Sequence, residues 1–226
     1  MVAEAAGKIP LMVHENWRFR PYFRRVKEWL DSGVAGAPLQ YRLTLYSSSL
    51  LPDANGRLPA RERQPFMRTE APLLVAESLI HQLDVTRWLM GPLDIRAAYI
   101  ARTCAEVAGE TAASIFMETA DGRPVLVEGN MSAAGEAPRA RDRLKIVCER
   151  GVIDLKDGVL SLSGPETRTE TFDFDQSYQA SFDAAVQHFV DCLAGGEPFE
   201  TDGPDNLATL KLVEDTYAFA ARAARK

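Results

Sequence analysis

Hydrophobic side chains recur at helical spacing in four segments of the chain. In each segment the apolar residues fall on one face, as they do in helices that pack against a core. Gly33 follows the first segment, and Gly91-Pro92 follows the second, and both are typical helix stop signals. We therefore expect helices at residues 21–31, 75–90 and 177–193, and a last helix that begins near residue 202.

Apolar and polar side chains alternate in a second set of segments, which is the pattern of half-buried strands. Most of these segments lie together in the middle of the chain and are separated by glycine-containing turns. Residues 9–13 differ, because they are almost wholly apolar and so predict a strand buried on both faces. The expected strands are residues 9–13, 38–48, 95–99, 113–117, 125–127, 144–148, 152–155, 159–162 and 169–174, and residues 49–72 are expected to form a long loop.

The strands cluster between helices and do not alternate with them. This order favours an α+β fold with one large, mainly antiparallel open sheet and helices packed on one of its faces. The opposite face must meet water or a partner. Because strands such as residues 112–117 are strongly apolar, we expect a partner subunit there and predict a homo-oligomer, a dimer at least.

Composition excludes several classes of protein. With 226 residues, of which 46% are hydrophobic and 26% charged, the chain can bury a core of its own. A net charge of −6 without a basic block argues against binding to nucleic acid. No apolar run is long enough for a membrane span and no signal peptide is visible, so a cytoplasmic location is the default expectation. Cys104, Cys148 and Cys192 are widely spaced and are expected to be buried free thiols.

Several common site motifs are missing from the sequence. No two of its 15 glycines are separated by a single residue, so the G-x-G-x-x-G dinucleotide fingerprint is absent. The P-loop, the G-x-S-x-G elbow and the H-E-x-x-H zinc motif are also absent. The histidines, at positions 14, 81 and 188, are too dispersed to indicate a metal cluster.

One polar group of residues stands out on the helix expected at residues 75–90. Glu77, His81 and Asp84 follow one another at i, i+4 and i+7, which places them within about 60° of each other around the helix. A histidine flanked by carboxylates can exchange a proton near neutral pH. The same spacing is also typical of a solvated, ion-paired helix face, so the pattern alone leaves both interpretations open.

Other polar residues give weaker signals. His188 lies between core positions and is expected to be a hydrogen-bonded structural histidine. The arginines at positions 18, 20, 24 and 25 form a local basic cluster. Such a cluster is either a solvated helix face or a site for a phosphate or carboxylate group.

Four segments, in the right order, resemble motifs of the Gfo/Idh/MocA oxidoreductases, the relatives of glucose–fructose oxidoreductase and inositol 2-dehydrogenase. Residues 13–21 resemble that family's E-N-x-R-F-x-P segment, and residues 31–36 resemble its G-x-x-G turn. Residues 77–91 resemble its D-x-x-x-H-x-x-D … W-L-x-G helix, and residues 178–195 resemble its F-x-x-F-v-d-a-i-x-x-G helix.

The resemblance implies part of a two-domain enzyme. In this family an N-terminal Rossmann domain binds NAD or NADP, and a C-terminal α+β domain supplies the substrate pocket and forms oligomers. The substrates are mostly sugars, cyclitols and related hydroxy compounds. Residues 1–14 look like a remnant of the first domain and residues 15–226 resemble the second. The Rossmann domain and the family's E-K-P segment with its catalytic lysine are missing, so the chain alone is expected neither to bind NAD(P) nor to be active.

The resemblance also implies roles for five residues. His81 would donate or accept the proton at the substrate hydroxyl while hydride moves to or from the nicotinamide. Glu77, which stands where the family commonly has Asp, would orient His81 or bind substrate. Asp84 would hold a substrate hydroxyl or the imidazole, and Asn16 and Arg18 would lie near the cleft between the domains and bind substrate.

Two other functions stay open at this stage. A stand-alone binding or assembly module could have kept the sheet interface and lost the chemistry. A cofactor-independent sugar isomerase or lyase could use Glu77 and His81 as an acid–base pair, since a fold does not fix the chemistry it hosts. The DNA upstream of Met1 would distinguish a truncated enzyme from these alternatives.

Overall fold

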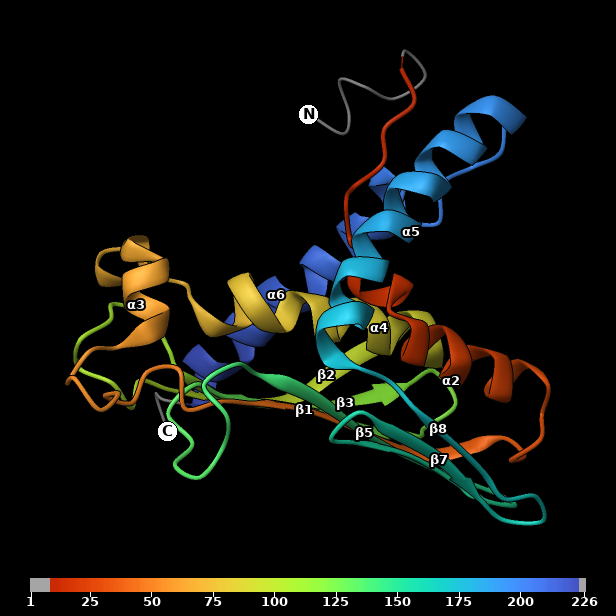
Figure 1. Cartoon of the computed structure of the whole chain (residues 1–226), viewed down its shortest axis with the longest axis horizontal. Coiled ribbons are helices and arrows are strands. Elements are labelled where there is room, and N and C mark those ends of the chain that lie inside the picture. Colours follow the sequence, from red (N-terminus) through yellow and green to blue (C-terminus); the bar gives the residue numbers. More distant parts are fainter. Residues whose placement is uncertain (1–8, 224–226) are drawn as a thin grey trace.

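A computed structural model describes residues 9–223 and shows helices packed on one face of a single eight-stranded sheet (Figure 1). Neighbouring strands are antiparallel except β1 and β4, which are parallel. The strands, in sheet order, are β2 (Leu93–Ala101), β3 (Ala112–Thr119), β4 (Pro124–Asn130), β1 (Pro38–Tyr46), β5 (Arg141–Cys148), β6 (Val152–Lys156), β7 (Val159–Ser163) and β8 (Arg168–Thr171). The predicted α+β fold with an open, mainly antiparallel sheet is confirmed.

The helices come from both ends of the chain and from the segment before the second strand. In Figure 1, α2, α4, α5 and α6 all lie on the same side of the sheet. The helical elements are η1 (Trp17–Phe19), α2 (Pro21–Asp31), α3 (Pro59–Arg63), η2 (Pro65–Arg68), η3 (Val75–Leu79), α4 (Ile80–Met90), α5 (Phe174–Gly195) and α6 (Gly203–Ala223). Of these, η1 and η2 are 3₁₀-helices and η3 is a π-helix.

The core lies between the helices and the inner face of the sheet. Successive side chains of a strand point to opposite faces, so Ile115 and Met117 of β3 are fully buried while Phe116 between them is 43% exposed. All three cysteines are buried free thiols, as expected. Within residues 9–223, no helix is both long enough and apolar enough to cross a membrane.

Apart from the strand expected at residues 9–13, the elements differ notably from the sequence pattern in three places. The expected loop at residues 49–72 contains α3 and η2, and its buried Leu58, Ala60 and Met67 join the core. The helix expected at residues 75–90 begins as the π-helix η3. Helix α5 begins at Phe174, inside the expected last strand, because the side chain of Asp173 accepts a hydrogen bond from the N–H of Gln176 and caps the helix.

The strand expected at residues 9–13 is the clearest correction. Only Met12 pairs with another segment, in an isolated antiparallel bridge to Asp202, and Ile9 is 64% exposed. The backbone N–H of Val13 donates to the carbonyl of Thr201 at 2.8 Å. An apolar run indicates that a segment tends to be buried, but it does not indicate which segment covers it. No strand of the described sheet pairs with residues 9–13. Residues 1–8, which belong to the expected domain remnant, lie outside the described residues.

A buried carboxylate ties two segments of the chain to the sheet. Asp142 lies on the inner face of β5 and is 4% exposed. It accepts hydrogen bonds from Arg20 Nη1 at 2.9 Å, from the Tyr22 hydroxyl at 2.7 Å and from Gln82 Nε2 at 2.8 Å. Burial raises the pKa of the Tyr22 phenol well above its ordinary value, so this hydroxyl keeps its proton and donates. The start of α2 and the first turn of α4 are therefore fastened to β5 at one point.

Replacing Asp142 by alanine leaves the Arg20 guanidinium buried without its carboxylate. We expect this change to lower the free energy of unfolding by about 3–5 kcal/mol, measured by urea denaturation. The matched control is Asp154→Ala, which breaks an exposed ion pair with Lys145 (Nζ to Oδ2, 3.0 Å). The control should cost less than about 1 kcal/mol. Similar losses from both substitutions would contradict the central place given to Asp142.

Candidate functional site

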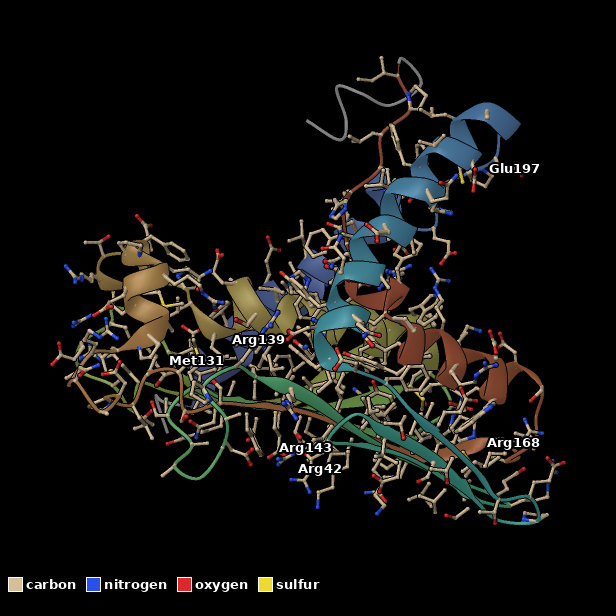
Figure 2. All side chains as sticks on the ribbon, in the orientation of Figure 1. Arg42, Met131, Arg139, Arg143, Arg168 and Glu197 are labelled. Atoms are coloured by element: carbon tan, nitrogen blue, oxygen red, sulfur yellow. The ribbon has the colours of Figure 1, made fainter. Side chains whose placement is uncertain are left out.

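A cavity of about 640 Å³ lies on the helix side of the sheet. The end of β1, α3, η3 with the start of α4, the segment between β4 and β5, and the start of α5 surround it. Figure 2 shows two of its lining residues, Met131 and Arg139, on this side, while Arg42 and Arg143 point from the opposite face. The lining residues are Trp17, Arg20, Leu45, Ser47, Ser49, Pro59, Ala60, Arg63, Gln64, Leu74, Glu77, Ser78, His81, Met131, Pro138, Arg139, Ala140, Phe174 and Tyr178.

His81 is the titratable ring in this cavity, and its partner is Glu15. The imidazole Nδ1 lies 2.8 Å from both carboxylate oxygens of Glu15. Glu15 is 4% exposed and also accepts the backbone N–H of Trp17 at 3.2 Å. An ionised carboxylate only accepts hydrogen bonds, so Nδ1 carries the proton. The other ring nitrogen, Nε2, has no hydrogen-bond partner among residues 9–223 and is left to serve a ligand.

The plane of the His81 ring is fixed by stacking. The indole of Trp17 lies parallel to the imidazole, with ring centroids 4.2 Å apart and an interplanar angle of 3°. The guanidinium carbon of Arg20 lies 3.7 Å from the centroid of a Trp17 ring. The imidazole is thus held both by a hydrogen bond in its plane and by a flat surface beneath it. Such double restraint is what positions a group for proton transfer.

The helical segment that carries Glu77 and His81 is fixed where it begins. Glu110 is 8% exposed and accepts the backbone N–H of Leu73 at 3.2 Å and of Val75 at 2.9 Å. A carboxylate at this point satisfies amides that have no partner within the helix and opposes the helix dipole favourably. Gly129 of β4 lies directly beneath the π-helix, where a Cβ would come within 2.9 Å of Leu79. The missing side chain allows this segment to approach the sheet closely.

Glu77 shares the cavity with His81, four residues along the helix. Its side chain is exposed and lines the cavity wall. Within the described chain no hydrogen bond or ion pair joins it to His81, whose ring is held by Glu15 instead. Glu15 therefore orients His81, which was one of the two roles predicted for Glu77. The other role, contact with a substrate, stays a prediction.

Asp84 lies in the core and not at the cavity, in contrast to the prediction. It is fully buried and is paired with Arg18, whose Nε donates to Oδ2 at 2.8 Å and whose Nη2 donates to Oδ1. Thr209 of α6 adds a hydrogen bond at 3.0 Å. Burial raises the pKa of the Asp84 carboxyl, and the hydrogen bonds from Arg18 oppose that shift. An offset of about 60° from His81 around the helix is enough to turn a side chain from the cavity edge into the core.

Asn16 and Arg18 are also engaged inside the protein. Asn16 is 4% exposed and donates to the Ser181 hydroxyl at 2.8 Å. Arg18 is 2% exposed and, besides Asp84, bonds the carbonyl of Glu200 at 2.9 Å and the carboxylate of Asp205 at 2.8 Å. Neither residue lines the cavity. The structure therefore places both, with Asp84, in internal networks, where the sequence predicted contact with substrate.

The basic cluster and the remaining histidines separate into different environments. Arg18 and Arg20 are buried ion-pair partners, whereas Arg24 makes a partly exposed ion pair with Glu200. His188 accepts the backbone N–H of Glu200 at 3.0 Å, which agrees with the structural role expected for it. Among residues 9–223 no group of histidine, cysteine and carboxylate side chains could hold a metal ion.

Glu15 and Trp17 were not predicted as site residues, although both stand in the segment at residues 13–21 that resembles a family motif. Glu15 is 66 residues away from His81, so no local spacing could pair them. One sequence signal could have pointed to them. A carboxylate and an aromatic residue that directly follow an apolar run, as Glu15 and Trp17 follow residues 9–13, indicate a segment that enters the core.

Comparison with known proteins identifies the family to which this α+β domain belongs. A family model described as the GFO/IDH/MocA C-terminal domain matches residues 23–154, more than half of the chain. The chain belongs to this family, and the resemblance seen in its motifs is confirmed.

Its relatives and structural neighbours agree. A D-apiose dehydrogenase from Rhizobium rhizogenes is 29% identical over 225 residues, covering 94% of this chain and 63% of that enzyme. A D-apiose dehydrogenase from Paraburkholderia graminis is 31% identical, covering 96% and 58%. The structure of an oxidoreductase from Agrobacterium radiobacter in complex with NAD⁺, L-tartaric acid and magnesium has a TM-score of 0.85 and 28% identity, covering 95% and 64%. The chain thus spans about three fifths of the length of these curated relatives.

The bond between Glu15 and His81 predicts the tautomer of the imidazole. At a pH where the ring is neutral, ¹⁵N NMR of the labelled chain should show the proton on Nδ1, because the Glu15 carboxylate accepts it. In Glu15→Ala the ring should shift toward the Nε2–H form that a free imidazole prefers. Glu77→Ala is the control and should leave the tautomer unchanged, since Glu77 does not bond the ring. An Nε2–H ring in the parent chain would refute the assignment.

Proposed function

We propose that this chain is the substrate-binding and proton-transferring part of an NAD(P)-dependent oxidoreductase that acts on a sugar, a cyclitol or a related hydroxy compound. The observation that carries the proposal is the His81–Glu15 pair at the wall of a cavity of about 640 Å³. The family supports it, since relatives include D-apiose dehydrogenases and inositol 2-dehydrogenases.

The side chains of the cavity fit one half of an alcohol oxidation. Oxidation of a carbinol removes a proton from oxygen and a hydride from carbon. Nε2 of His81 accepts the proton, and the Glu15 carboxylate at Nδ1 stabilises the imidazolium that forms. Glu77 accepts a hydrogen bond from a neighbouring hydroxyl of the substrate, and Trp17 keeps the ring in place. In the reverse direction the same imidazolium returns the proton.

The residues of this chain do not include the element that binds the pyrophosphate of a dinucleotide. The sequence has no glycine-rich strand-to-helix turn, which is the element that receives a pyrophosphate at a helix N-terminus. The hydride acceptor would therefore be held by another domain. In this proposal residues 1–14 are the end of that domain and residues 15–226 form the substrate-binding and oligomerisation domain.

Helix α5 supports the presence of a neighbouring domain. Its far half extends away from the sheet in Figure 1 and bears an apolar stripe at helical spacing. Val186 is 54% exposed, Val190 51% and Leu193 46%. The segment from Ile9 to His14 runs beside this helix (Figure 1), and the His14 ring lies 5.4 Å from that of Phe182. An exposed apolar stripe of this kind is typical of an interface.

The test of the function is oxidation by this chain combined with a nucleotide-binding domain. With NAD⁺ or NADP⁺ and a panel of sugars, cyclitols and related hydroxy acids that includes D-apiose, myo-inositol and D-gluconate, we expect at least one compound to reduce the dinucleotide. His81→Ala should lower kcat by about 10²–10⁴-fold with a smaller change in KM, because proton transfer acts in the transition state. His14→Ala, at a ring outside the cavity, is the control. A kcat for His81→Ala within a few-fold of the parent would remove His81 from the mechanism. No turnover in the combined protein would favour the non-enzymatic module.

The outer face of the sheet supports a homo-oligomer. It exposes large apolar side chains beside charged ones: Leu39 is 47% exposed, Tyr99 68%, Phe116 43% and Val159 39%. An uncovered apolar surface of this kind favours association with a second copy.

Light scattering at micromolar concentration should therefore give the mass of a dimer or a larger assembly. Phe116→Glu should shift the mass toward the monomer, because it places a charge in the buried interface. Val190→Glu on α5 replaces an apolar residue that is 51% exposed, against 43% for Phe116, and that lies on the stripe assigned to the neighbouring domain. It should leave the mass unchanged. A monomeric parent chain would overturn this part of the proposal.

A further inference from the structure

The cavity carries more positive than negative side chains, although the whole chain has a net charge of −6. Its lining residues include Arg20, Arg63 and Arg139, and Glu77 is the one lining carboxylate. The excess of positive charge in the cavity is opposite in sign to the net charge of the chain. It therefore indicates a specific role within the site.

The three arginines differ in how firmly the protein holds them. Arg20 is 1% exposed and is bound by Asp142, so it belongs to the framework. Arg139 is paired with Asp175, but both side chains are at least half exposed, and such pairs contribute little. Arg63 is exposed, and within residues 9–223 no carboxylate oxygen lies within 4 Å of it. Two guanidinium groups are therefore available to a ligand.

These groups and the acid–base residues come from different elements around the cavity. Arg63 projects from α3, and Arg139 comes from the segment between β4 and β5, where it lies 4.7 Å over the ring of Phe174. Glu77 and His81 come from η3 and α4. We call Glu77 and His81 the acid–base part of the cavity. Glu77 makes no ion pair with either arginine in the described chain, so its charge does not neutralise them.

We propose that the substrate is a polyhydroxy carboxylic acid whose carboxylate binds Arg63 and Arg139 while its reacting hydroxyl lies at His81. The inference rests on the proposed function and specifies its substrate class. The planar fork of a guanidinium matches a carboxylate in two parallel hydrogen bonds. Glu77 repels a carboxylate at the acid–base part and so favours one orientation of the ligand. The hydroxyl and amide groups of Ser47, Ser78 and Gln64 remain for the other hydroxyls.

Binding of matched acids and polyols to the chain tests this class directly. D-Gluconate and D-glucitol share one carbon skeleton and differ in the carboxylate, and D-galactonate and galactitol form a second such pair. By calorimetry at low salt, at least one acid should bind tenfold or more tightly than its polyol, and added salt should reduce the difference. Arg63→Gln should weaken binding of that acid by about 10- to 100-fold and leave the polyol unchanged.

Arg68→Gln is the matched control. It removes a nearby exposed arginine, on η2, which does not line the cavity. We expect no change in affinity for either ligand. Arg139→Gln is the second variant and should weaken binding of the acid while leaving the polyol unchanged.

Several results would overturn the proposal. These are equal affinities within both pairs, no binding of either acid at millimolar concentration, an acid affinity unchanged in both arginine variants, or equally tight binding of acetate, which would show attraction of any anion. Binding needs neither dinucleotide nor turnover. A failure of the carboxylate inference can therefore be distinguished from a failure of the proposed oxidoreductase function. Arginine-dependent binding of the acid without oxidation in the combined protein would refute only the oxidoreductase role. If the combined protein oxidises neutral sugars, and Arg63→Gln does not change that activity, only the inference that the substrate carries a carboxylate is refuted.

Discussion

The buried ion pair between Arg20 and Asp142 determines where the groups of the cavity lie. Two charges removed from water are stable only when each meets the other with good geometry and further hydrogen bonds. Here Tyr22 and Gln82 supply those bonds. Gln82 is the neighbour of His81 on α4, and the Arg20 guanidinium lies over Trp17. A single buried contact therefore sets the position of α4 against the sheet and of the indole against the imidazole.

A second pair, Arg18 with Asp84, complements the first. The two arginines stand two residues apart at the 3₁₀-helix η1 and reach carboxylates on different elements, one on α4 and one on β5. Asp205 at the start of α6 joins Arg18, so the C-terminal helix is included in the same network. These contacts explain why η1, only three residues long, is buried and ordered between larger elements. Arg18 and Asp84, which the sequence predicted as substrate contacts, are instead buried supports of the elements around the cavity.

More of the fold than of the candidate site could be predicted from the sequence, for a physical reason. Periodicity reports which face of an element is buried, so the strands of the sheet and the bounds of α2 were predictable from spacing alone. Periodicity does not indicate which charged side chains pair with one another. The pairing of Glu15 with His81 joins residues far apart in the chain, and Asp84 looked accessible because Arg18 was not known to lie against it. Likewise, Arg63 sits on a short helix in a stretch that has no period of its own.

The attachment of His81 to Glu15 has a mechanical consequence. Glu15 belongs to the segment that enters this domain from the N-terminal side, and that segment is held to the start of α6 by the contacts of Met12 and Val13 with Asp202 and Thr201. His81 belongs to α4, which is fastened to the sheet. A relative displacement of about 1 Å between the two segments would lengthen the hydrogen bond at Nδ1. The position of the imidazole is therefore coupled to that of residues 9–15, so a movement of this segment would reach the wall of the cavity through one hydrogen bond.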